Sequence, residues 1–259
     1  MKVATWNINE CVGITCDLNN QNTTDTININ NIEEIIKKIN ENDFDIVCFQ
    51  EYPVYINDNI SLTDKILKET KLKYYALKDT YNSYLFNGGK VGVAIFSKYI
   101  IINTQYTLFG NPHMTKISSK GIKYESFDKA IIRVNIKKDN DYYTIITGHA
   151  MAFMPFDKTE FDYPESYKPL EEFINQFKND NLIVMGDFNT ERLYEIIPTI
   201  KEIVKDTIIG PTTKDYYENR GEVHMDYIMI NNNIKSINTY KIDNFSDHYI
   251  MCSELIKTN

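Results

Sequence analysis

Short apolar runs that end in a polar side chain constrain the fold of this chain more than any other feature. In NLIVMGDFNT, at 181–190, such a run is followed at once by Asp187 and Asn189. Similar runs end at Glu51, in DIVCFQE, and at His149, in YTIITGH. Apolar runs of this length, bounded by turn residues, are typical of buried strands. Side chains at strand ends are a common origin of binding sites in α/β proteins.

Helix-like stretches alternate with these runs. Apolar residues at helical spacing predict helices over 31–43, 62–72, 166–180 and 190–206, with a break at Pro198 in the last of them. Ser61 or Thr63 is placed to cap the second helix. Strands are expected over 2–9, 44–51, 74–81, 91–98, 101–109, 129–138, 141–150, 181–189, 224–230 and 248–255. A hairpin is expected around Asp139-Asn140-Asp141, and no Pro-, Gly- or Ser-rich linker divides the chain. The whole chain, 1–259, is therefore predicted to be a single domain.

The charge balance limits the kinds of partner. The formal net charge of −8 argues against a protein that coats nucleic acid through a broad basic face. It is compatible with an enzyme that meets phosphate locally through a metal ion. Arginine occurs only at Arg133, Arg192 and Arg220, so lysine has to supply most positive contacts.

The cysteines and the N-terminus bear on the compartment. Cys48 and Cys252 lie in apolar runs and are expected to be small core residues. Cys11 and Cys16 lie in a polar loop and could pair or bind metal, but with no adjacent histidine the preferred interpretation is reduced thiols. The start MKVATWNINE lacks the apolar run of a signal peptide, and no apolar stretch approaches the ~18 residues that span a bilayer. These features predict a cytoplasmic protein with no membrane span.

Three of the polar residues have ordinary structural alternatives when each is considered alone. Asp187 could cap the following helix, although Thr190 is equally well placed to do so. Glu51 could be a solvated loop carboxylate. His149 could be a histidine whose hydrogen bonds are purely structural. A functional interpretation of these residues therefore depends on the set rather than on one member.

Two further motifs strengthen the set. Asp226 interrupts the apolar run HMDYIMI, and a buried carboxylate needs a partner or a cation. In Asp247-His248 the carboxylate fits a group that orients the imidazole and raises its pKa, although the pair also fits an exposed turn. Carboxylates, amides and imidazoles at successive strand ends have the composition of a divalent-cation site with acid–base groups. Hard oxygen ligands suit magnesium, manganese or calcium.

Seven short segments occur in a recognisable order over nearly the whole chain. They are TWNIN at 5–9, DIVCFQE at 45–51, GVAIFSK at 92–98, TGHA at 147–150, GDFNT at 186–190, MDYIMI at 225–230 and SDH at 246–248. This series resembles the endonuclease/exonuclease/phosphatase superfamily, the deoxyribonuclease I-like phosphoesterases. The resemblance implies an α/β (α+β) fold, a four-layer α-β-β-α sandwich in which two packed mixed β-sheets are flanked by helices. It also implies a divalent-metal-dependent phosphoesterase.

The resemblance assigns roles to individual residues. It implies that the ion, Mg²⁺ or Mn²⁺, is held by Asn7, Asn9, Glu51 and Asp247. It implies a catalytic group made of His149, Asp187, Asn189, Asp247 and His248. Asp226 matches a remaining acidic residue that supports the phosphate. Lys129 is the residue nearest to an arginine that touches substrate in relatives, and His224-Met225 stands where relatives often have a basic residue.

These roles lead to an expected reaction. Asp187, oriented by Asn189, would position or deprotonate the attacking water, while His149 and His248 would contact phosphate oxygens and move protons, both with a pKa in the usual range of histidine. The predicted function is hydrolysis of phosphodiester bonds, with DNA or RNA as the favoured substrate. Small-molecule, inositol or lipid phosphoesters are the alternative, although no PAWCDRIL-like segment typical of inositol 5-phosphatases occurs. A non-catalytic binding module on the same scaffold is a third interpretation.

Loops that follow the strands are expected to decide the substrate. They are the segments 53–61, 109–126 and 151–167, which all flank strand ends. The segment 109–126 carries lysines and could follow a phosphate backbone, with Tyr124 or Phe127 as a stacking surface. A solvated charged loop is an equally good interpretation of it.

Overall fold

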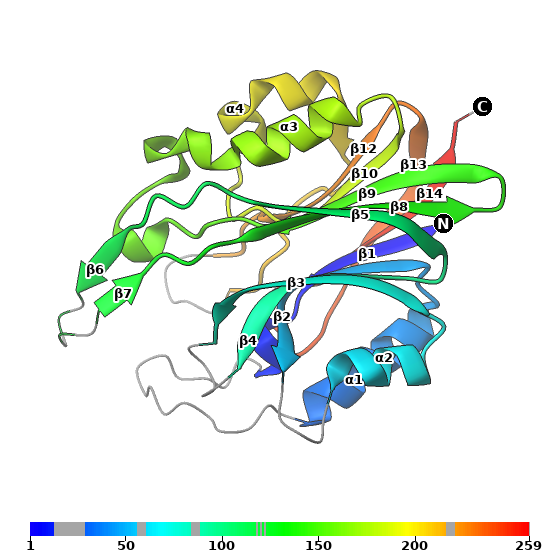
Figure 1. Cartoon of the computed structure of the whole chain (residues 1–259), viewed down its shortest axis with the longest axis horizontal. Coiled ribbons are helices and arrows are strands. Elements are labelled where there is room, and N and C mark those ends of the chain that lie inside the picture. The colour runs from blue at the N-terminus through cyan, green and yellow to red at the C-terminus, as the bar shows by residue number, and fades with distance from the viewer. Residues whose placement is uncertain are drawn as a thin grey trace.

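Two six-stranded sheets, stacked face to face, form the centre of the molecule (Figure 1). The computed structural model describes residues 1–12, 29–55, 61–83, 89–117, 119, 121, 123–215 and 221–258. The first sheet has the order β13 (Ile234–Ile242), β14 (Ile250–Lys257), β1 (Lys2–Asn7), β2 (Ile46–Tyr55), β4 (Lys90–Ser97) and β3 (Tyr74–Asn82). The second has the order β11 (Val204–Asp206), β12 (Asp226–Asn231), β10 (Asn181–Asp187), β9 (Asp141–His149), β8 (Ala130–Lys138) and β5 (Ile100–Leu108).

Both sheets are mixed. In the first, β1 runs parallel to β2, and in the second, β9 runs parallel to β10, while the other neighbours are antiparallel. The predicted hairpin around Asp139 is confirmed as the β8–β9 connection, and Asp139 itself has the left-handed φ of 55° that a tight turn favours. A short two-stranded hairpin, β6 (Thr115–Ile117) and β7 (Lys123–Glu125), projects from the body (Figure 1).

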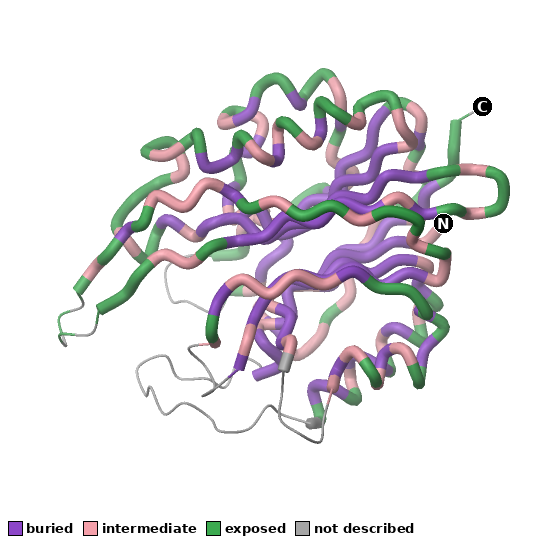
Figure 2. The backbone as a smooth tube through the Cα atoms, in the orientation of Figure 1, coloured by how far each residue is buried: buried purple, intermediate pink, exposed green. Residues whose placement is uncertain are grey.

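Successive residues of the central strands point to opposite faces of each sheet. Val3 of β1 and Ile183 of β10 belong to the apolar layer between the sheets. Their neighbours Ala4 and Val184 face outward and pack under the helices. The central strands are therefore buried on both faces (Figure 2), which is why their sequences are almost continuously apolar.

Helices cover the outer face of each sheet and complete four layers. Helices α1 (Ile29–Asn42) and α2 (Leu62–Glu69) lie on the first sheet, and α3 (Lys168–Gln176) and α4 (Leu193–Ile196) lie on the second (Figure 1). Among the described residues, five short 3-10 helices join the elements: η1 (Asn9–Cys11), η2 (Met154–Phe156), η3 (Glu160–Asp162), η4 (Pro164–Tyr167) and η5 (Pro198–Glu202). The predicted four-layer sandwich is confirmed.

Some local predictions hold and one is largely wrong. The hydroxyl of Ser61 accepts a hydrogen bond from the Asp64 amide at 3.1 Å and caps α2, as expected. The continuous helix predicted over 190–206 is instead α4, η5 and strand β11, with Pro198 starting the 3-10 turn. Residues 204–206 are drawn into the sheet by pairing with β12, so the tertiary context overrides their helical spacing.

The cysteines agree with the preferred interpretation where they are described. Cys11, Cys48 and Cys252 are free and buried, so Cys11 belongs to the core rather than to a polar loop. Cys16 lies outside the described residues, as do parts of the loop segments 53–61 and 109–126. Within the described part of the chain, no helix combines the length and apolar character needed to cross a membrane.

Candidate active site

Strand register alone places three of the predicted site residues side by side. Asp187, the last residue of β10, is paired with His149 at the end of the parallel β9 and with Asp226 at the start of the antiparallel β12. All three side chains are buried. Residues in register on adjacent strands point to the same face, and Asp187 shares its face with Ile183 and Met185, which look toward the first sheet.

The first sheet brings a second group of residues to the same place. Asn7, the last residue of β1, donates a hydrogen bond from Nδ2 to Oδ2 of Asp187 at 3.0 Å. The amide oxygen of Asn7 accepts the backbone N–H of Asn9 at 3.0 Å. Glu51 lies on the neighbouring strand β2, one residue beyond the position paired with Asn7. The candidate site therefore lies between the ends of the two sheets.

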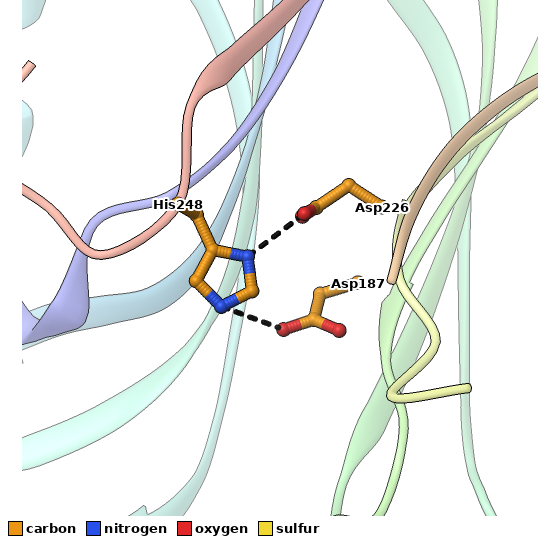
Figure 3. A group of neighbouring side chains, drawn as sticks. All are labelled: Asp187, Asp226 and His248. Carbon is orange, nitrogen blue, oxygen red and sulfur yellow. Dashed lines mark hydrogen bonds and ion pairs between the residues drawn. The ribbon is translucent and has the colours of Figure 1, made fainter. Parts of the chain in front are cut away.

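His248 is held between two carboxylates (Figure 3). Its Nδ1 lies 2.8 Å from Oδ2 of Asp226, and its Nε2 lies 3.7 Å from Oδ2 of Asp187. Burial lowers the pKa of this imidazole, but Asp226 and Asp187 outweigh it and hold the pKa well above its usual value. His248 is therefore an imidazolium near neutral pH, and its buried charge is paired on both sides.

The partner of His248 differs from the one expected from the sequence. Asp247 precedes it in the chain and was predicted to orient the ring, but Asp226 makes the hydrogen bond. Oδ1 of Asp247 accepts a hydrogen bond from the Ser246 hydroxyl at 3.1 Å instead. Asp247 acts electrostatically on Glu51, and its charge also helps to raise the pKa of His248.

Asp187 occupies the centre of the site. Besides the Asn7 contact, its Oδ1 accepts the backbone N–H of Asn189 at 2.9 Å. Asn189 donates its side-chain amide to the carbonyl oxygen of Ala150 at 3.1 Å, which fixes the turn after β10. Burial raises the pKa of Asp187, the positive His248 lowers it, and Asp226 raises it again, with a net upward shift. Asp187 does not cap the following helix, because that turn is bonded by Thr190 through the Arg192 amide at 3.0 Å.

His149 has the opposite electrostatic surroundings. Its Nδ1 lies 3.3 Å from Nζ of Lys129, a buried lysine whose ammonium also lies 4.5 Å from the ring centre of Tyr81. Burial lowers the pKa of His149 well below its usual value, and the charges of Lys129 and His248 lower it further. The expectation that both histidines share the usual pKa range is therefore wrong for each of them. A neutral ring that accepts from Lys129 at Nδ1 carries its proton on Nε2, which lies 3.6 Å from Asp187.

Glu51 and its neighbours are suited to a divalent cation. Burial raises the pKa of Glu51, Lys129 lowers it, and Asp247 raises it. Its carboxylate lies 3.9 Å from Nε2 of His149. Ligand-type atoms of Asp187, Asp226 and His248 also lie within 4.8 Å of one another, and Oδ1 of Asp226 is buried with no hydrogen-bond partner. Because a protonated His248 has no free lone pair, the two carboxylates are the available ligands of this group. Crowded carboxylate oxygens with an unmatched acceptor fit a hard cation.

Backbone strain is concentrated at the same place. Nine described non-glycine residues have a positive φ. The ones at the site are Asn9, Glu10, Cys11, Glu51 and Asn189. Such conformations cost about 1–3 kcal/mol each and persist where the surrounding structure imposes them. The turn after β1, the middle of β2 and the turn after β10 are thus held in the shape that aims these side chains.

Sequence reasoning missed two residues of the site. The hydroxyl of Thr212 accepts the backbone N–H groups of Met225 and Asp226, at 2.9 and 3.0 Å, and so fixes the start of β12. Nothing in the local sequence PTT marks that role. Glu10, which is fully buried near Glu51, follows the segment TWNIN directly, and its position one residue after Asn9 is a signal that could have included it.

His224 does not contribute to the site. Its Nε2 lies 2.9 Å from Oδ2 of Asp206, and its Nδ1 donates to the carbonyl oxygen of Gly210 at 2.8 Å. A ring that donates from both nitrogens is protonated. Burial lowers its pKa, but Asp206 and Gly210 outweigh this and raise it. His224 therefore anchors the loop that carries Thr212, and the basic contact found in relatives is missing from this position.

Comparison with known proteins agrees with this geometry. The chain belongs to the Endonuclease/Exonuclease/phosphatase family, whose sequence model matches residues 4–248. No curated protein matches the chain in a sequence search. Members of this family are phosphoester hydrolases that typically use divalent metals, and the described residues include an acidic group able to hold one.

Solved structures are similar over almost the full length. A family protein from Leptotrichia buccalis has 18% identity and a TM-score of 0.66, with 99% of each chain covered. A mannosyl-6-phosphatase from Bacteroides thetaiotaomicron has 15% identity and a TM-score of 0.65, also with 99% of each chain covered. The human Nocturnin catalytic domain has 16% identity and a TM-score of 0.66, with 100% of this chain and 93% of that one covered. At these identities the likeness establishes the fold.

Proposed function

We propose that this chain is a divalent-metal-dependent phosphodiesterase that acts on nucleic acid. The proposal depends on the surroundings of the buried Asp187 carboxylate. Its Oδ2 accepts a hydrogen bond from Asn7 at 3.0 Å. The same oxygen lies 3.6 Å from Nε2 of His149 and 3.7 Å from Nε2 of His248. A base and two imidazole N–H groups around one point match the needs of phosphoryl transfer to water.

The two sides of Asp187 have separate tasks in this proposal. Asp187, with its raised pKa, accepts a proton from the attacking water. The imidazolium of His248 donates from Nε2 to a phosphate oxygen and offsets the charge that develops there. His149, neutral and protonated on Nε2, donates a second hydrogen bond. A cation held by Glu51 with Asn7, Asn9 and Asp247 supplies Lewis-acid stabilisation of the phosphate when bound.

The preference for a polymeric substrate rests on the segment between β5 and β8. Strands β6 and β7 extend from the body (Figure 1), and Lys129 of the site follows β7 in the chain, directly before β8. Lys116 of the hairpin pairs with Asp157 at 2.7 Å and ties the hairpin to the loop that follows His149. Ile117 and Tyr124 are exposed on the hairpin, where an aromatic ring and lysines suit bases and phosphates.

The net charge favours a second candidate, the hydrolysis of small phosphoesters. A net charge of −8 disfavours long-range attraction of a polyanion, whereas a small ester needs only the local site. The mannosyl-6-phosphatase among the structural neighbours has the same fold.

A substrate panel separates the two candidates. Purified protein is assayed with Mg²⁺, Mn²⁺ or EDTA on plasmid, abasic duplex, single-stranded DNA, RNA, bis-p-nitrophenyl phosphate and inositol and sugar phosphates. The proposal expects metal-dependent cleavage of at least one nucleic acid that EDTA abolishes. Cleavage of the small esters alone would replace the nuclease assignment with the second candidate.

A further inference from the structure

Glu10 is a buried carboxylate that the roles described above leave unused. It lies one residue beyond the TWNIN segment, in the strained turn after β1, and it is fully buried. Its Oε2 accepts a hydrogen bond from the hydroxyl of Ser83. Its Oε1 is buried and has no hydrogen-bond partner. Leaving a buried charged acceptor unmatched is costly, so a further group has to account for it.

The turn that carries Glu10 lies against the strand that carries Glu51, because the Ile8 amide donates to the carbonyl oxygen of Gln50 at 3.1 Å. Burial and the charge of Glu51 raise the pKa of Glu10, Ser83 and Lys129 lower it, and the net result is a pKa of about 8. Lys129 has to serve Glu51 and Asp187 as well. One ammonium shared among the buried Glu10 and Asp187 and the partly buried Glu51 leaves this side of the site short of positive charge.

The backbone holds Glu10 in this unfavourable position. The amide of Cys11 bonds to the carbonyl oxygen of Ile8 at 2.8 Å, and Asn31 of α1 donates to the carbonyl oxygen of Cys11 at 2.9 Å. The turn is therefore fixed on both sides of Glu10. A single hydrogen bond to Ser83 satisfies only one oxygen of this carboxylate.

We propose that Glu10 and Glu51 together receive one divalent cation, so that the metal of this chain is bound between two glutamates. The inference rests on the proposed metal-dependent function and adds a ligand that none of the family motifs supplied. A Mg²⁺ or Mn²⁺ ion provides the charge that Lys129 alone does not, and it gives Oε1 of Glu10 a partner. Since Mg²⁺ keeps several of its waters, Oε1 can meet the ion directly or through a metal-bound water.

The test measures metal binding in the absence of substrate. Mn²⁺ affinity is determined by calorimetric titration, and the thermal midpoint is recorded with and without Mn²⁺, for wild type and Glu10→Gln. Gln has the same shape, can still accept from Ser83 and removes only the charge. We expect Mn²⁺ affinity to fall about tenfold or more, in the range seen for changes next to a metal ligand. The metal-free midpoint should stay equal to wild type or rise, because the Gln amide accepts from Ser83 as the carboxyl does and never carries a charge into the core.

Three further variants complete the test. Glu41→Gln changes an exposed glutamate of α1 and should leave Mn²⁺ binding unchanged, whereas Glu51→Gln should weaken it strongly. Ser83→Ala leaves Glu10 in place and removes its donor, so the unbound carboxylate is less stable, and Mn²⁺ affinity and the metal-induced rise of the midpoint should both increase. This variant tests the inference even if Glu10→Gln does not fold.

The outcomes separate the inference from the proposed function. If Glu10→Gln lowers the metal-free midpoint and binds Mn²⁺ as wild type does, Glu10 is a structural partner of Ser83 and the inference is wrong. The inference is equally wrong if Ser83→Ala shows no larger metal-induced rise than wild type. If wild type itself binds neither Mn²⁺ nor Mg²⁺, the proposed metal-dependent function fails as well.

Discussion

The two histidines beside Asp187 differ in charge although their positions are nearly equivalent. Both rings are buried, and their Nε2 atoms lie 3.6 and 3.7 Å from the same carboxylate oxygen. The difference arises at Nδ1, where His248 meets the carboxylate of Asp226 and His149 meets the ammonium of Lys129. As a result, the pKa of His248 is raised and that of His149 is lowered.

This comparison shows that the residue behind the ring decides what the ring can do. Burial lowers the pKa of both imidazoles, so burial alone would make both neutral. A carboxylate at Nδ1 reverses that effect and yields a cation, while a lysine at the same atom enforces a neutral tautomer. One side of Asp187 thus offers a positive charge and the other a neutral donor.

Removing the group between the two histidines should have the largest effect. Asp187→Asn keeps the shape of the side chain but cannot accept a proton from water. General bases contribute about 10²–10⁴-fold, so turnover should fall at least about a hundredfold with the fold intact. The measurement is hydrolysis of the best substrate from the panel, with circular dichroism as the control for folding. Activity near that of wild type in the folded variant would remove Asp187 from the mechanism.

Removing the cationic side should be the next most damaging change. His248→Ala deletes the imidazolium that faces the phosphate, and turnover should again fall at least about a hundredfold. The raised pKa gives the protonated ring a stabilising role that is fully present below pH ~6.5 and is lost as the pH rises through the folded-state pKa. Thermal unfolding from pH 6 to 10 should therefore show a loss of stability at alkaline pH that is smaller in His248→Ala.

A milder change sharpens the same comparison. Asp226→Asn leaves an oxygen that can accept from Nδ1 of His248 but removes the negative charge behind it. The pKa of His248 should fall, so the alkaline limb of the pH–rate profile should move to lower pH. An unchanged limb would mean that Asp226 does not control the charge of His248.

Much of the fold could be predicted from sequence because its causes are local. Continuous apolar runs identified the central strands, and helical spacing identified α1, α2 and α3. The segment 190–206 was misjudged because its pairing partner, β12, lies about 20 residues further along the chain. A spacing rule that considers one segment at a time cannot include that pairing.

The site was predictable as a set of residues but not as a set of contacts. His149, Asp187 and Asp226 lie together because strand register aligns them, which the positions at strand ends already suggested. The partner of His248 was misassigned because neighbours in sequence seemed the simplest pair, whereas the pair that forms is 22 residues apart. Glu10 went unnoticed because its importance comes from burial, which its polar neighbours in the sequence conceal.

Changing the residue behind the neutral ring should have the smallest effect on turnover. Lys129→Met removes the ammonium beside Nδ1 of His149 and keeps a flexible apolar chain of similar length. The pKa of His149 should rise, because one of the charges that lowers it has gone while burial remains. Ring resonances followed by NMR from pH 4 to 9 would measure this. The chain has 4 histidines, and the resonance of His149 is identified as the one missing from the spectrum of His149→Gln.

The matched control for this change lies on the same strand. Lys137→Met alters an exposed lysine of β8. The ammonium of Lys137 lies 5.9 Å from the ring of Tyr142, whereas the ammonium that contacts His149 is that of Lys129. It should leave the pKa of His149 unchanged, whereas Lys129→Met should raise it and lower turnover by about tenfold. If both variants leave that pKa where it is, burial alone keeps His149 neutral. The contrast between the two histidines would then depend only on Asp226.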